Sequence, residues 1–436
     1  MRFLHFRKYF QSGHVLHAVY LSNVFRIYFL NIYFKTNMKT NKTWLVVIAW
    51  LAACSSPMED LNSIDDNRDY STLSKNPSIN SQVYELVPQE ERKLFEISFP
   101  CTHNSYNYKG RFEKSNVFDN LPSQFQKGIR AIEIDVHEKS TYHFPFKVKK
   151  DISVYHGKAT NGANGSRLAH YVLEEVRDFI LENPKEMVFL KFETTVSGSQ
   201  IDKLMDKSGL SGLVFDQIKT NPYPTKEDVI ASGKRIIITR QIGNSRFSPS
   251  LPRHTAGGGY SDNSDHNPQS QPSENKYFSM QYYGITSVAG YGDADRAKYL
   301  NHPSRLGEFV DQTWKLNGKK PWRVIVDFPS VHNNHYYEVI EEMNERAIAK
   351  VRIVDESGNI MMKDGSNLYH WNWECAYENG VVMAKTSGEC NFPIKAYETI
   401  TLKPVSNQFD FVPKQVVISH DDNKNDYLVS FIATRK

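Results

Sequence analysis

The 436-residue sequence lacks several features that would assign it to common protein classes. It has only four cysteines and no Cys-x-x-Cys motif, which disfavours a disulfide scaffold and a structural zinc site. No glycine-rich phosphate-binding motif follows the first predicted strand, which argues against a nucleotide-binding doubly wound sheet. The apolar run at residues 44–53 is half of the about 20 residues that a membrane-spanning helix needs.

Acidic residues are absent from the first 53 positions, which contain seven lysines or arginines. Removing those seven from the 53 basic residues leaves 46 against 49 acidic ones, a net charge of −3 for the remainder. Nucleic-acid binding depends on neutralising phosphates with positive charge. The slightly acidic body of the chain therefore gives no case for a nucleic-acid partner.

Residues 1–53 are predicted to be an upstream extension plus a lipoprotein signal peptide, with translation starting at Met38. A short basic start and an apolar run lead to Leu51-Ala-Ala-Cys54, which resembles the bacterial lipobox. We expect Cys54 to be lipidated and to anchor the exported protein to a membrane of the bacterial cell envelope. A plain secreted protein with an incidental cysteine is the alternative.

A flexible tether is predicted over residues 54–80, which are rich in Ser, Asn and Asp. Its acidic residues resemble the export tags of surface-displayed lipoproteins of some Gram-negative bacteria. A solvated linker without a signal is the alternative interpretation.

From residue 81 to residue 349, β-rich runs alternate with helical ones, and the size suits a (β/α)8 TIM barrel of the α/β class. A doubly wound open sheet is the alternative. Three helices are predicted, one from Leu168 to a stop at Asn183-Pro184 and two over Arg305–Leu316 and His335–Ala349. The predicted strands are Leu94–Phe99, Ala131–Val136, Ser153–Tyr155, Met187–Phe192, Arg235–Thr239 and Arg323–Phe328.

Two further segments have patterns of their own. The polar stretch Gln241–Lys276, with Gly257-Gly258-Gly259, is too long for a turn and is predicted to be a functional lid or disordered.

Alternating apolar residues and turn signals predict a small β-sandwich domain over residues 350–436, which resembles prealbumin-like or carboxypeptidase-regulatory-like β-domains. Within it Cys375 and Cys390 could pair in an oxidising compartment, whereas Cys101 is predicted to be a buried small residue.

Chemistry-bearing side chains follow the predicted strands, where a (β/α)8 barrel carries its functional residues. Glu133 and Asp135 are two apart on a strand, so both point to the interior. Two inward carboxylates repel each other unless a cation lies between them. Asn104 and Glu193 can supply more oxygen ligands, and an all-oxygen set suits Ca²⁺ better than zinc.

Charge arithmetic in these motifs supports dependence on a divalent cation. The only basic residue in the motif cores is Lys191, on the same strand face as Glu193. One ammonium cannot balance Glu133, Asp135 and Glu193 and also bind a phosphodiester. Chelation is therefore expected to abolish turnover, and Ca²⁺ to restore it better than Mg²⁺.

Each motif also has a structural interpretation. A histidine after a strand is commonly hydrogen-bonded for structure, and Glu-x-Asp commonly marks a solvated face. The intervening Ile132, Ile134 and Val136 are apolar, however, which fits outward packing against helices. The joint occurrence of such features at successive strand ends favours a functional site.

These residues resemble the catalytic X region of phosphatidylinositol-specific phospholipase C. The resemblance covers about residues 94–195 and is carried by Thr102-His103-Asn104-Ser105, Gly128-Ile-Arg-Ala-Ile-Glu133-Ile-Asp135, Val154-Tyr-His156-Gly157 and Phe189-Leu-Lys-Phe-Glu193. It implies that His103 and His156 are the acid/base pair. It also implies that Asn104, Glu133, Asp135 and Glu193 are ligands of calcium, as in the calcium-dependent branch.

The resemblance implies that an inositol phospholipid at a membrane surface is cleaved to inositol 1,2-cyclic phosphate and diacylglycerol. Lys191 and Arg240 are candidate substrate-binding residues, Tyr282 and Tyr283 could stack on the inositol ring, and Asp327 could orient a histidine or accept a sugar hydroxyl. One alternative is a glycerophosphodiester phosphodiesterase, which would begin with His-Arg-Gly rather than His103-Asn104-Ser105. The other is a non-enzymatic surface-binding lipoprotein, which would need no histidine pair.

Overall fold

The computed structural model describes residues 84–143, 147–157, 162–215, 223–239, 242–247, 255–260, 278–284, 291–361, 371–384 and 389–436. The predictions for the signal peptide, Cys54, the tether and Arg240 lie outside these residues. The chain divides into two compact units, Met1–Ile79 and Asn80–Lys436, and the described residues all belong to the second. None of the described helices is both long and apolar enough to cross a membrane.

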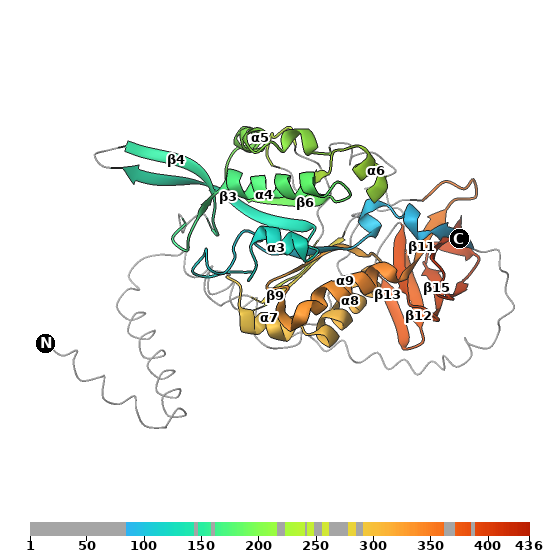
Figure 1. The fold of residues 1–436 in the computed structure, drawn as a ribbon. Coiled ribbons are helices and arrows are strands. Elements are labelled where there is room, and N and C mark those ends of the chain that lie inside the picture. The colour runs from blue at the N-terminus through green and yellow to red at the C-terminus, as the bar shows by residue number, and fades with distance from the viewer. Residues whose placement is uncertain are drawn as a thin grey trace, which may run out of the picture. The chain divides into compact units, whose positions relative to one another are not determined.

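A mixed sheet forms the centre of the larger part of this unit (Figure 1). In the described part of the chain its parallel strands follow the spatial order β7 (Ile236–Ile238), β6 (Val188–Thr194), β3 (Ala131–His143), β2 (Phe99–Thr102), β10 (Pro321–Val326), β9 (Phe278–Gly284) and β8 (Thr255–Tyr260). No pairing between β7 and β8 is present among the described residues. The parallel α/β architecture is therefore confirmed, while closure into an eight-stranded barrel stays a prediction.

The helices of this part pack around the sheet, and the sequence explains where several begin and end. Helix α4 (Ala169–Glu182) ends at Asn183 before Pro184, as predicted, and α8 (Pro303–Asn317) ends at Gly318 in the left-handed conformation that favours glycine. The other helices are α3 (Leu121–Gln126), α5 (Gly198–Lys207), α6 (Lys226–Ala231), α7 (Ala294–Leu300) and α9 (His335–Glu345), with short 3₁₀ helices at Gln89–Glu91, Leu94–Glu96, Ser211–Leu213 and Val331–Asn334.

Alternation along β3 separates the core from the site. Ile132, Ile134 and Val136 join the large hydrophobic cluster that the strands share with the helices. Ala131 lies in a second cluster with Phe189 of β6 and Ile325 of β10, on the inner side of the sheet. Glu133 and Asp135 therefore share the inner face with Ala131.

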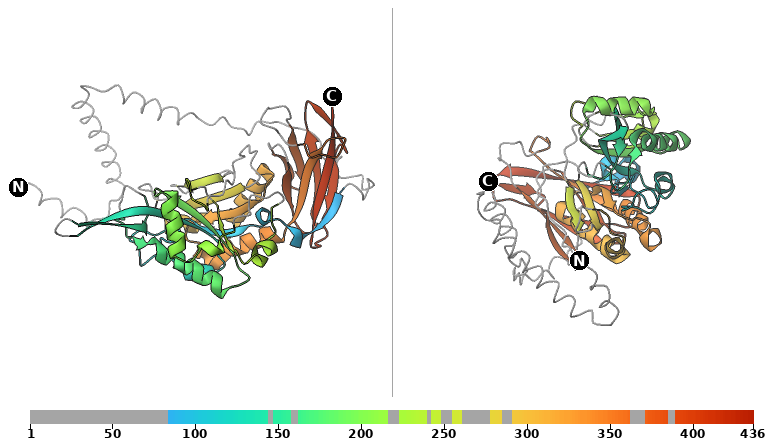
Figure 2. Two further views of the ribbon diagram at one scale, coloured as in Figure 1. Left: turned by 90° about the horizontal axis from the view of Figure 1, so that it is seen from above. Right: turned by 90° about the vertical axis from the view of Figure 1, so that its left-hand side faces the viewer.

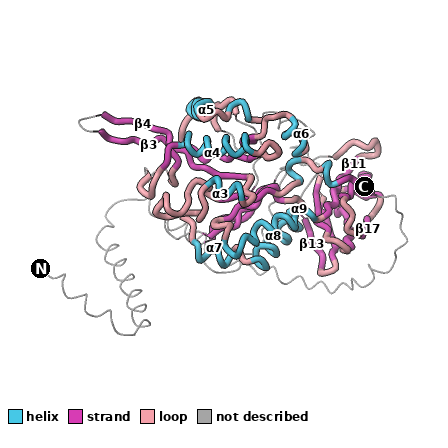
Figure 3. The backbone as a smooth tube through the Cα atoms, in the orientation of Figure 1, coloured by secondary structure: helices cyan, strands magenta, loops and turns pink. Residues whose placement is uncertain are grey.

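The second half of β3 leaves the parallel sheet and forms a hairpin with β4 (Lys147–Val154), to which β5 (Arg167–Leu168) is added. Figure 3 shows that the hairpin extends beyond the helices. The predicted strand Ser153–Tyr155 is thus the end of an antiparallel strand. The hairpin forms because β3 pairs with β6 only as far as Val136.

Three other sequence predictions need correction. Leu94–Glu96 is a 3₁₀ helix, closed by the Lys93 N–H that donates to Glu96 Oε2 at 2.8 Å, and the strand begins at Phe99. Within the predicted lid or disordered stretch Gln241–Lys276, Gly257-Gly258-Gly259 belongs to strand β8, because its backbone pairs with β9, and most of the remaining stretch lies outside the described residues. The predicted helix from His335 ends at Glu345, and Ala347 begins β11 (Ala347–Val354).

The carboxyl-terminal residues form two sheets around one hydrophobic cluster. One sheet contains β1 (Tyr84–Pro88), β18 (Asn425–Arg435), β11, β14 (Cys390–Ile394) and β16 (Phe409–Val412), and the other contains β13 (Gly380–Ala384), β12 (Asn372–Tyr377), β15 (Thr399–Val405) and β17 (Val416–Ser419). In Figure 2 the blue strand β1 lies beside the red strand β18, with which it pairs. The strands predicted after residue 350 are present, but their sheet also recruits residues 84–88.

The described cysteines are all buried and form no disulfide with one another. Cys375 and Cys390, predicted as a possible pair, lie in different sheets, on β12 and β14. Burial raises the pKa of Cys101 to about 11 and that of Cys375 to about 12, so both are neutral thiols near pH 7. Cys101 is the buried small residue that the sequence predicted.

Candidate active site

His103 follows β2, and its ring is held from two sides. Its Nδ1 lies 3.0 Å from Oδ1 of Asp327, the residue after β10, and its ring stacks on Tyr283 of β9 with centroids 4.1 Å apart. A carboxylate only accepts hydrogen bonds, so His103 Nδ1–H is the donor to Asp327. His103 Nε2 then carries the lone pair, and Asn104 Nδ2, 3.2 Å away, donates to it.

Asp327 is fully buried at the end of β10. Its Oδ1 accepts from His103 and, at 3.0 Å, from Asn116 Nδ2, while its Oδ2 has no hydrogen-bond partner among the described residues. Burial raises the pKa of this carboxyl above its ordinary value, opposed by the charge of His103 and the two hydrogen bonds. These donors therefore determine whether Asp327 is ionised near neutral pH.

Asn116 connects the parts of this network, and the sequence analysis missed it. It is fully buried, its Oδ1 accepts from Asn107 Nδ2 at 2.6 Å, and its backbone oxygen accepts from the Phe328 N–H. A Cβ at Gly292 would lie 2.9 Å from Asn116 Cα, so a larger residue at Gly292 would displace Asn116. No sequence motif identifies Asn116, because it lies in a loop and the fold alone brings it to its hydrogen-bond partner Asp327.

The turn that carries His103 is fixed by side chains from neighbouring elements. The Thr102 hydroxyl donates to Gln124 Oε1 at 2.8 Å, and Gln124 Nε2 donates to the Ser105 carbonyl at 2.7 Å. The Ser105 N–H donates to the backbone oxygen of Glu133, which ties the turn to β3. Asn104 adopts a left-handed backbone with φ of 47°, a conformation that asparagine tolerates better than most residues.

Lys191 lies between two of the predicted metal ligands. In the register of β3 and β6, Glu133 pairs with Lys191 and Asp135 with Glu193. The Lys191 side chain is 2% exposed, and its ammonium forms ion pairs with Glu133 Oε1 and, at 2.8 Å, with Glu193 Oε1. Glu133 Oε2 is buried and accepts no hydrogen bond within the described residues.

These positions do not fit a calcium site in the arrangement found. The ammonium of Lys191 lies against both Glu133 and Glu193, while Asp135 Oδ2 accepts a hydrogen bond from Tyr106 at 3.2 Å. In the part of the chain that the structure describes, no three His, Cys, Asp or Glu side chains are grouped so that they could hold a metal ion. Calcium binding therefore stays a prediction from the sequence.

His156 follows β4 by two residues, with its ring 4.9 Å from that of Tyr291. Its pKa is lowered from 6.5, first by burial and then by the positive charge of His103, while Glu193 opposes the shift. The second predicted histidine is thus within electrostatic reach of the first. Both histidines and Glu193 gather at the carboxyl ends of the strands.

A buried arginine, missed in the sequence, adds positive charge to the inner face. Arg323 of β10 is 4% exposed, and its Nε donates to Ser279 Oγ at 3.0 Å. Burial lowers the pKa of Arg323, and the negative charge of Glu193 opposes that shift. Arg323 lies four residues before Asp327, so the alternation of side chains along the strand places both residues on the same face. This alternation could have identified Arg323 from the sequence.

The predicted role of Tyr282 needs correction. Its ring stacks on Phe309 of α8, with centroids 4.2 Å apart, in the hydrophobic cluster outside the sheet. Successive residues of a strand point to opposite faces, so Tyr283 takes the inner position and contacts His103. Arg240, the other predicted contact, lies outside the described residues.

Comparison with known proteins identifies a family that part of this chain resembles. Residues 90–247 match the family model described as PI-PLC X. No curated protein matches the chain. Solved structures similar to it include phosphatidylinositol-specific phospholipase C of Staphylococcus aureus, with 12% identity, a TM-score of 0.37 and coverage of 58% of this chain and 94% of that one. The enzyme of Listeria monocytogenes has 17% identity, a TM-score of 0.35 and coverage of 58% and 95%.

These structural similarities are too low to add to the family match. The match itself includes His103, Glu133, Asp135, His156, Lys191 and Glu193. By this segment the chain is a phosphodiesterase. Residues 90–247 are similar to the X region of the phosphatidylinositol phospholipase C family.

Proposed function

We propose that this protein cleaves phosphatidylinositol-type lipids by intramolecular phosphoryl transfer. The inositol 2-hydroxyl attacks the neighbouring phosphorus, so that an O–P bond forms while the bond from phosphorus to the glycerol oxygen breaks. The products are inositol 1,2-cyclic phosphate and diacylglycerol. The observation that carries this proposal is the Asp327–His103 pair beside a second histidine, His156, whose pKa responds to it.

His103 is proposed as the base. Asp327 holds the proton on Nδ1, so Nε2 is the nitrogen able to take the proton of the 2-hydroxyl. The Tyr283 ring keeps the imidazole from turning, because the two rings are stacked at an interplanar angle of 16°. Asn104 donates to Nε2 here, and its amide has to release that nitrogen when the hydroxyl arrives.

His156 is proposed as the acid that gives its proton to the departing glycerol oxygen. A lowered pKa makes the protonated imidazole a stronger acid but reduces its population near pH 7. Once His103 has taken a proton, its positive charge favours loss of the proton from His156. The two transfers are therefore coupled in the direction that the reaction requires.

Lys191 and the buried Arg323 on the inner face are proposed to contribute positive charge beside the phosphate, while Glu133, Asp135 and Glu193 leave a negative balance that these two cations do not offset alone. Lys191 is oriented by Glu133 and Glu193, which hold an extended side chain in one position. Such preorganised charge stabilises a phosphoryl group more strongly than mobile ions in water. Calcium, predicted from the sequence, is the alternative source of this charge.

The substrate is proposed to be presented at a membrane surface, because diacylglycerol lipids do not leave bilayers readily. Lipidation of Cys54, also a proposal, would keep the enzyme at the cell envelope. A glycerophosphodiester phosphodiesterase and a non-enzymatic surface-binding lipoprotein remain the alternatives.

Mass spectrometry of the water-soluble product tests the proposal. Wild-type protein and a His103→Gln variant are incubated with phosphatidylinositol vesicles. We expect inositol cyclic phosphate from the wild type and none from the variant. Glycerol phosphate would indicate the glycerophosphodiesterase alternative, and no product from either protein would support the binding protein.

A further inference from the structure

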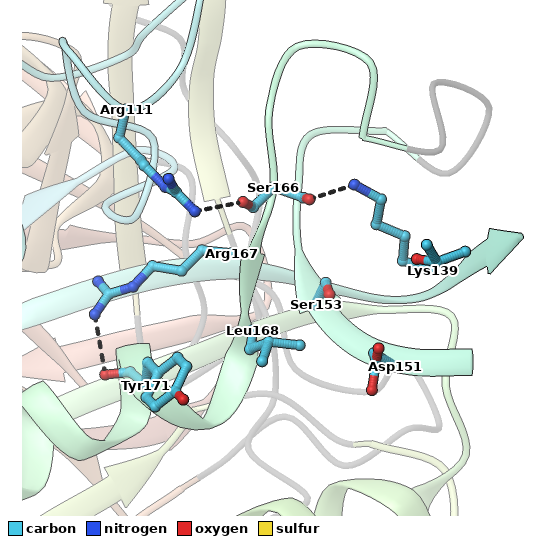
Figure 4. A pocket seen from close by; sticks show the side chains of 9 residues that line it. Arg111, Lys139, Asp151, Ser153, Ser166, Arg167, Leu168 and Tyr171 are labelled. Carbon is cyan, nitrogen blue, oxygen red and sulfur yellow. Dashed lines mark hydrogen bonds between the residues drawn. The ribbon is translucent and has the colours of Figure 1, made fainter. Parts of the chain in front are cut away.

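A cavity of about 330 Å³ lies at the base of the β3–β4 hairpin, outside the residues assigned to catalysis (Figure 4). It is bounded by the hairpin, by β5 with the start of α4, and by the loop after His103. The polar side chains of its lining are those of Arg111, Lys139, Thr141, Asp151, Ser153, Ser166, Arg167 and Tyr171. A volume of this size is at the lower end of the range for small-molecule sites.

Two cations approach Ser166 in this cavity from opposite sides, as Figure 4 shows. Arg111 Nη2 donates to the Ser166 carbonyl at 3.1 Å, and Lys139 Nζ donates to the Ser166 hydroxyl at 2.5 Å. Within the described residues, neither Arg111 nor Lys139 forms an ion pair with a carboxylate. Two like charges are thus held on either side of one residue without a counter-ion from the described chain.

The other charges at the cavity are balanced. Arg167 forms a two-pronged pair with Glu175, with hydrogen bonds of 2.7 and 2.9 Å. Asp151, the carboxylate in the wall, pairs with Lys149 at 3.0 Å. The positive excess of the cavity therefore resides on Arg111 and Lys139.

We propose that this cavity is a second anion site that binds a phosphomonoester group. The guanidinium and the ammonium would face the phosphate oxygens, and the hydroxyls of Ser153 and Thr141 on the cavity wall can donate further hydrogen bonds. An anion would relieve the repulsion between the two cations. It would also replace their hydrogen bonds to the neutral Ser166 with stronger, charge-assisted hydrogen bonds. The phosphate belongs to a lipid head group or is free phosphate.

The position of the cavity connects it to the proposed reaction. Ser153 lies three residues before His156 on the same segment, and Arg111 lies in the loop that also carries Asn116. A phosphate on a lipid head group would thus be held beside the site rather than in it. This connection rests on the proposed function, whereas the binding of phosphate does not.

The test measures binding in protein that carries His103→Gln, so that no substrate is consumed. Vesicles of phosphatidylcholine contain phosphatidylinositol or phosphatidylinositol 4-phosphate, and a parallel titration uses inorganic phosphate. Arg111→Gln/Lys139→Gln is compared with Lys150→Gln/Lys298→Gln, which removes the same charge from exposed residues. Equal thermal unfolding temperatures establish that the variants are folded.

We expect about tenfold tighter binding to the vesicles with the phosphomonoester, lost in Arg111→Gln/Lys139→Gln and retained in the control. Inorganic phosphate bound alone, with the same loss, also supports the site and assigns it to free phosphate. The proposal is overturned if the cavity variant keeps the preference of the parent, or if the parent binds neither probe. Failure of the phospholipase proposal would be seen separately, as absence of product from wild-type protein.

Discussion

Two buried polar networks in this protein differ in whether every carboxylate oxygen accepts a hydrogen bond. Where the carboxyl-terminal strands meet the larger part, Arg92 donates from Nε and Nη2 to both oxygens of Asp426, at 2.9 and 2.7 Å. Its remaining donors reach the carbonyls of Asn344 and Arg346, and Asp426 also accepts from the Ile348 N–H. Every polar atom of this pair has a partner.

At the candidate site, by contrast, Asp327 Oδ2 and Glu133 Oε2 are buried and accept no hydrogen bond within the described residues. A buried acceptor without a partner costs folding free energy. The difference indicates that the Arg92–Asp426 pair fixes the structure, whereas the site keeps acceptors available at a cost in stability.

Replacing Arg92 with methionine should produce the largest change in stability. Asp426 would remain buried with its charge uncompensated, which lowers the free energy of unfolding by about 3–5 kcal/mol. Urea denaturation measures this loss, and turnover at low temperature should stay near that of the wild type. Lys150→Met, which breaks an exposed pair with Glu138, is the control and should leave the free energy of unfolding nearly unchanged. A loss as small as the control's would mean that the saturated pair is not structural.

Replacing Lys191 with methionine should reduce kcat by about 10- to 100-fold, because charged hydrogen bonds at the phosphate are lost. The same assay in excess chelator should leave wild-type turnover nearly unchanged if Lys191 supplies the charge. Loss of activity with chelator, restored by Ca²⁺ better than by Mg²⁺, would instead establish the calcium dependence predicted from the sequence.

The sequence predicts the parts of this molecule that depend on local pattern. The apolar alternation of Ile132, Ile134 and Val136 fixed the faces of β3, and Pro184 marked the end of α4. It could not predict that Asn116 donates a hydrogen bond to Asp327, since that contact joins residues more than 200 positions apart. The sequence also could not predict the register that places the Lys191 ammonium between Glu133 and Glu193, and the charge argument for calcium stays a prediction.

Asn116→Ala should reduce kcat by about tenfold with little change in KM, because Asn116 positions Asp327 rather than substrate. Loss of its hydrogen bond also raises the pKa of Asp327 further. Asp327 then takes up its proton at a higher pH, and the acid limb of the rate profile should move upward. Asn372→Ala, at an exposed position of β12, is the control. An unchanged profile in Asn116→Ala would contradict the positioning role.

The pH dependence of His156 should give the smallest effect, a shift rather than a loss. Its pKa is lowered, so the protonated form that donates to the leaving oxygen disappears at a lower pH than for an ordinary histidine near 6.5. The alkaline limb of kcat/KM for phosphatidylinositol should therefore fall below about pH 6.5. A nitrophenyl substrate, whose leaving group needs no acid, should lack this limb. Equal losses on both substrates in His156→Ala would reject the assignment.

Asparagine replacements at Asp327 and Asp426, measured side by side for turnover and thermal unfolding, test the central claim most directly. Burial raises the pKa of Asp327, so its ionised form opposes folding near pH 7, and a neutral isostere should keep or raise the unfolding temperature. Asp327→Asn should lose at least about 100-fold in turnover while remaining as stable as the wild type. Asp426→Asn should be strongly destabilised yet active at low temperature. The account is contradicted if Asp327→Asn loses as much stability as Asp426→Asn, or if it retains full turnover.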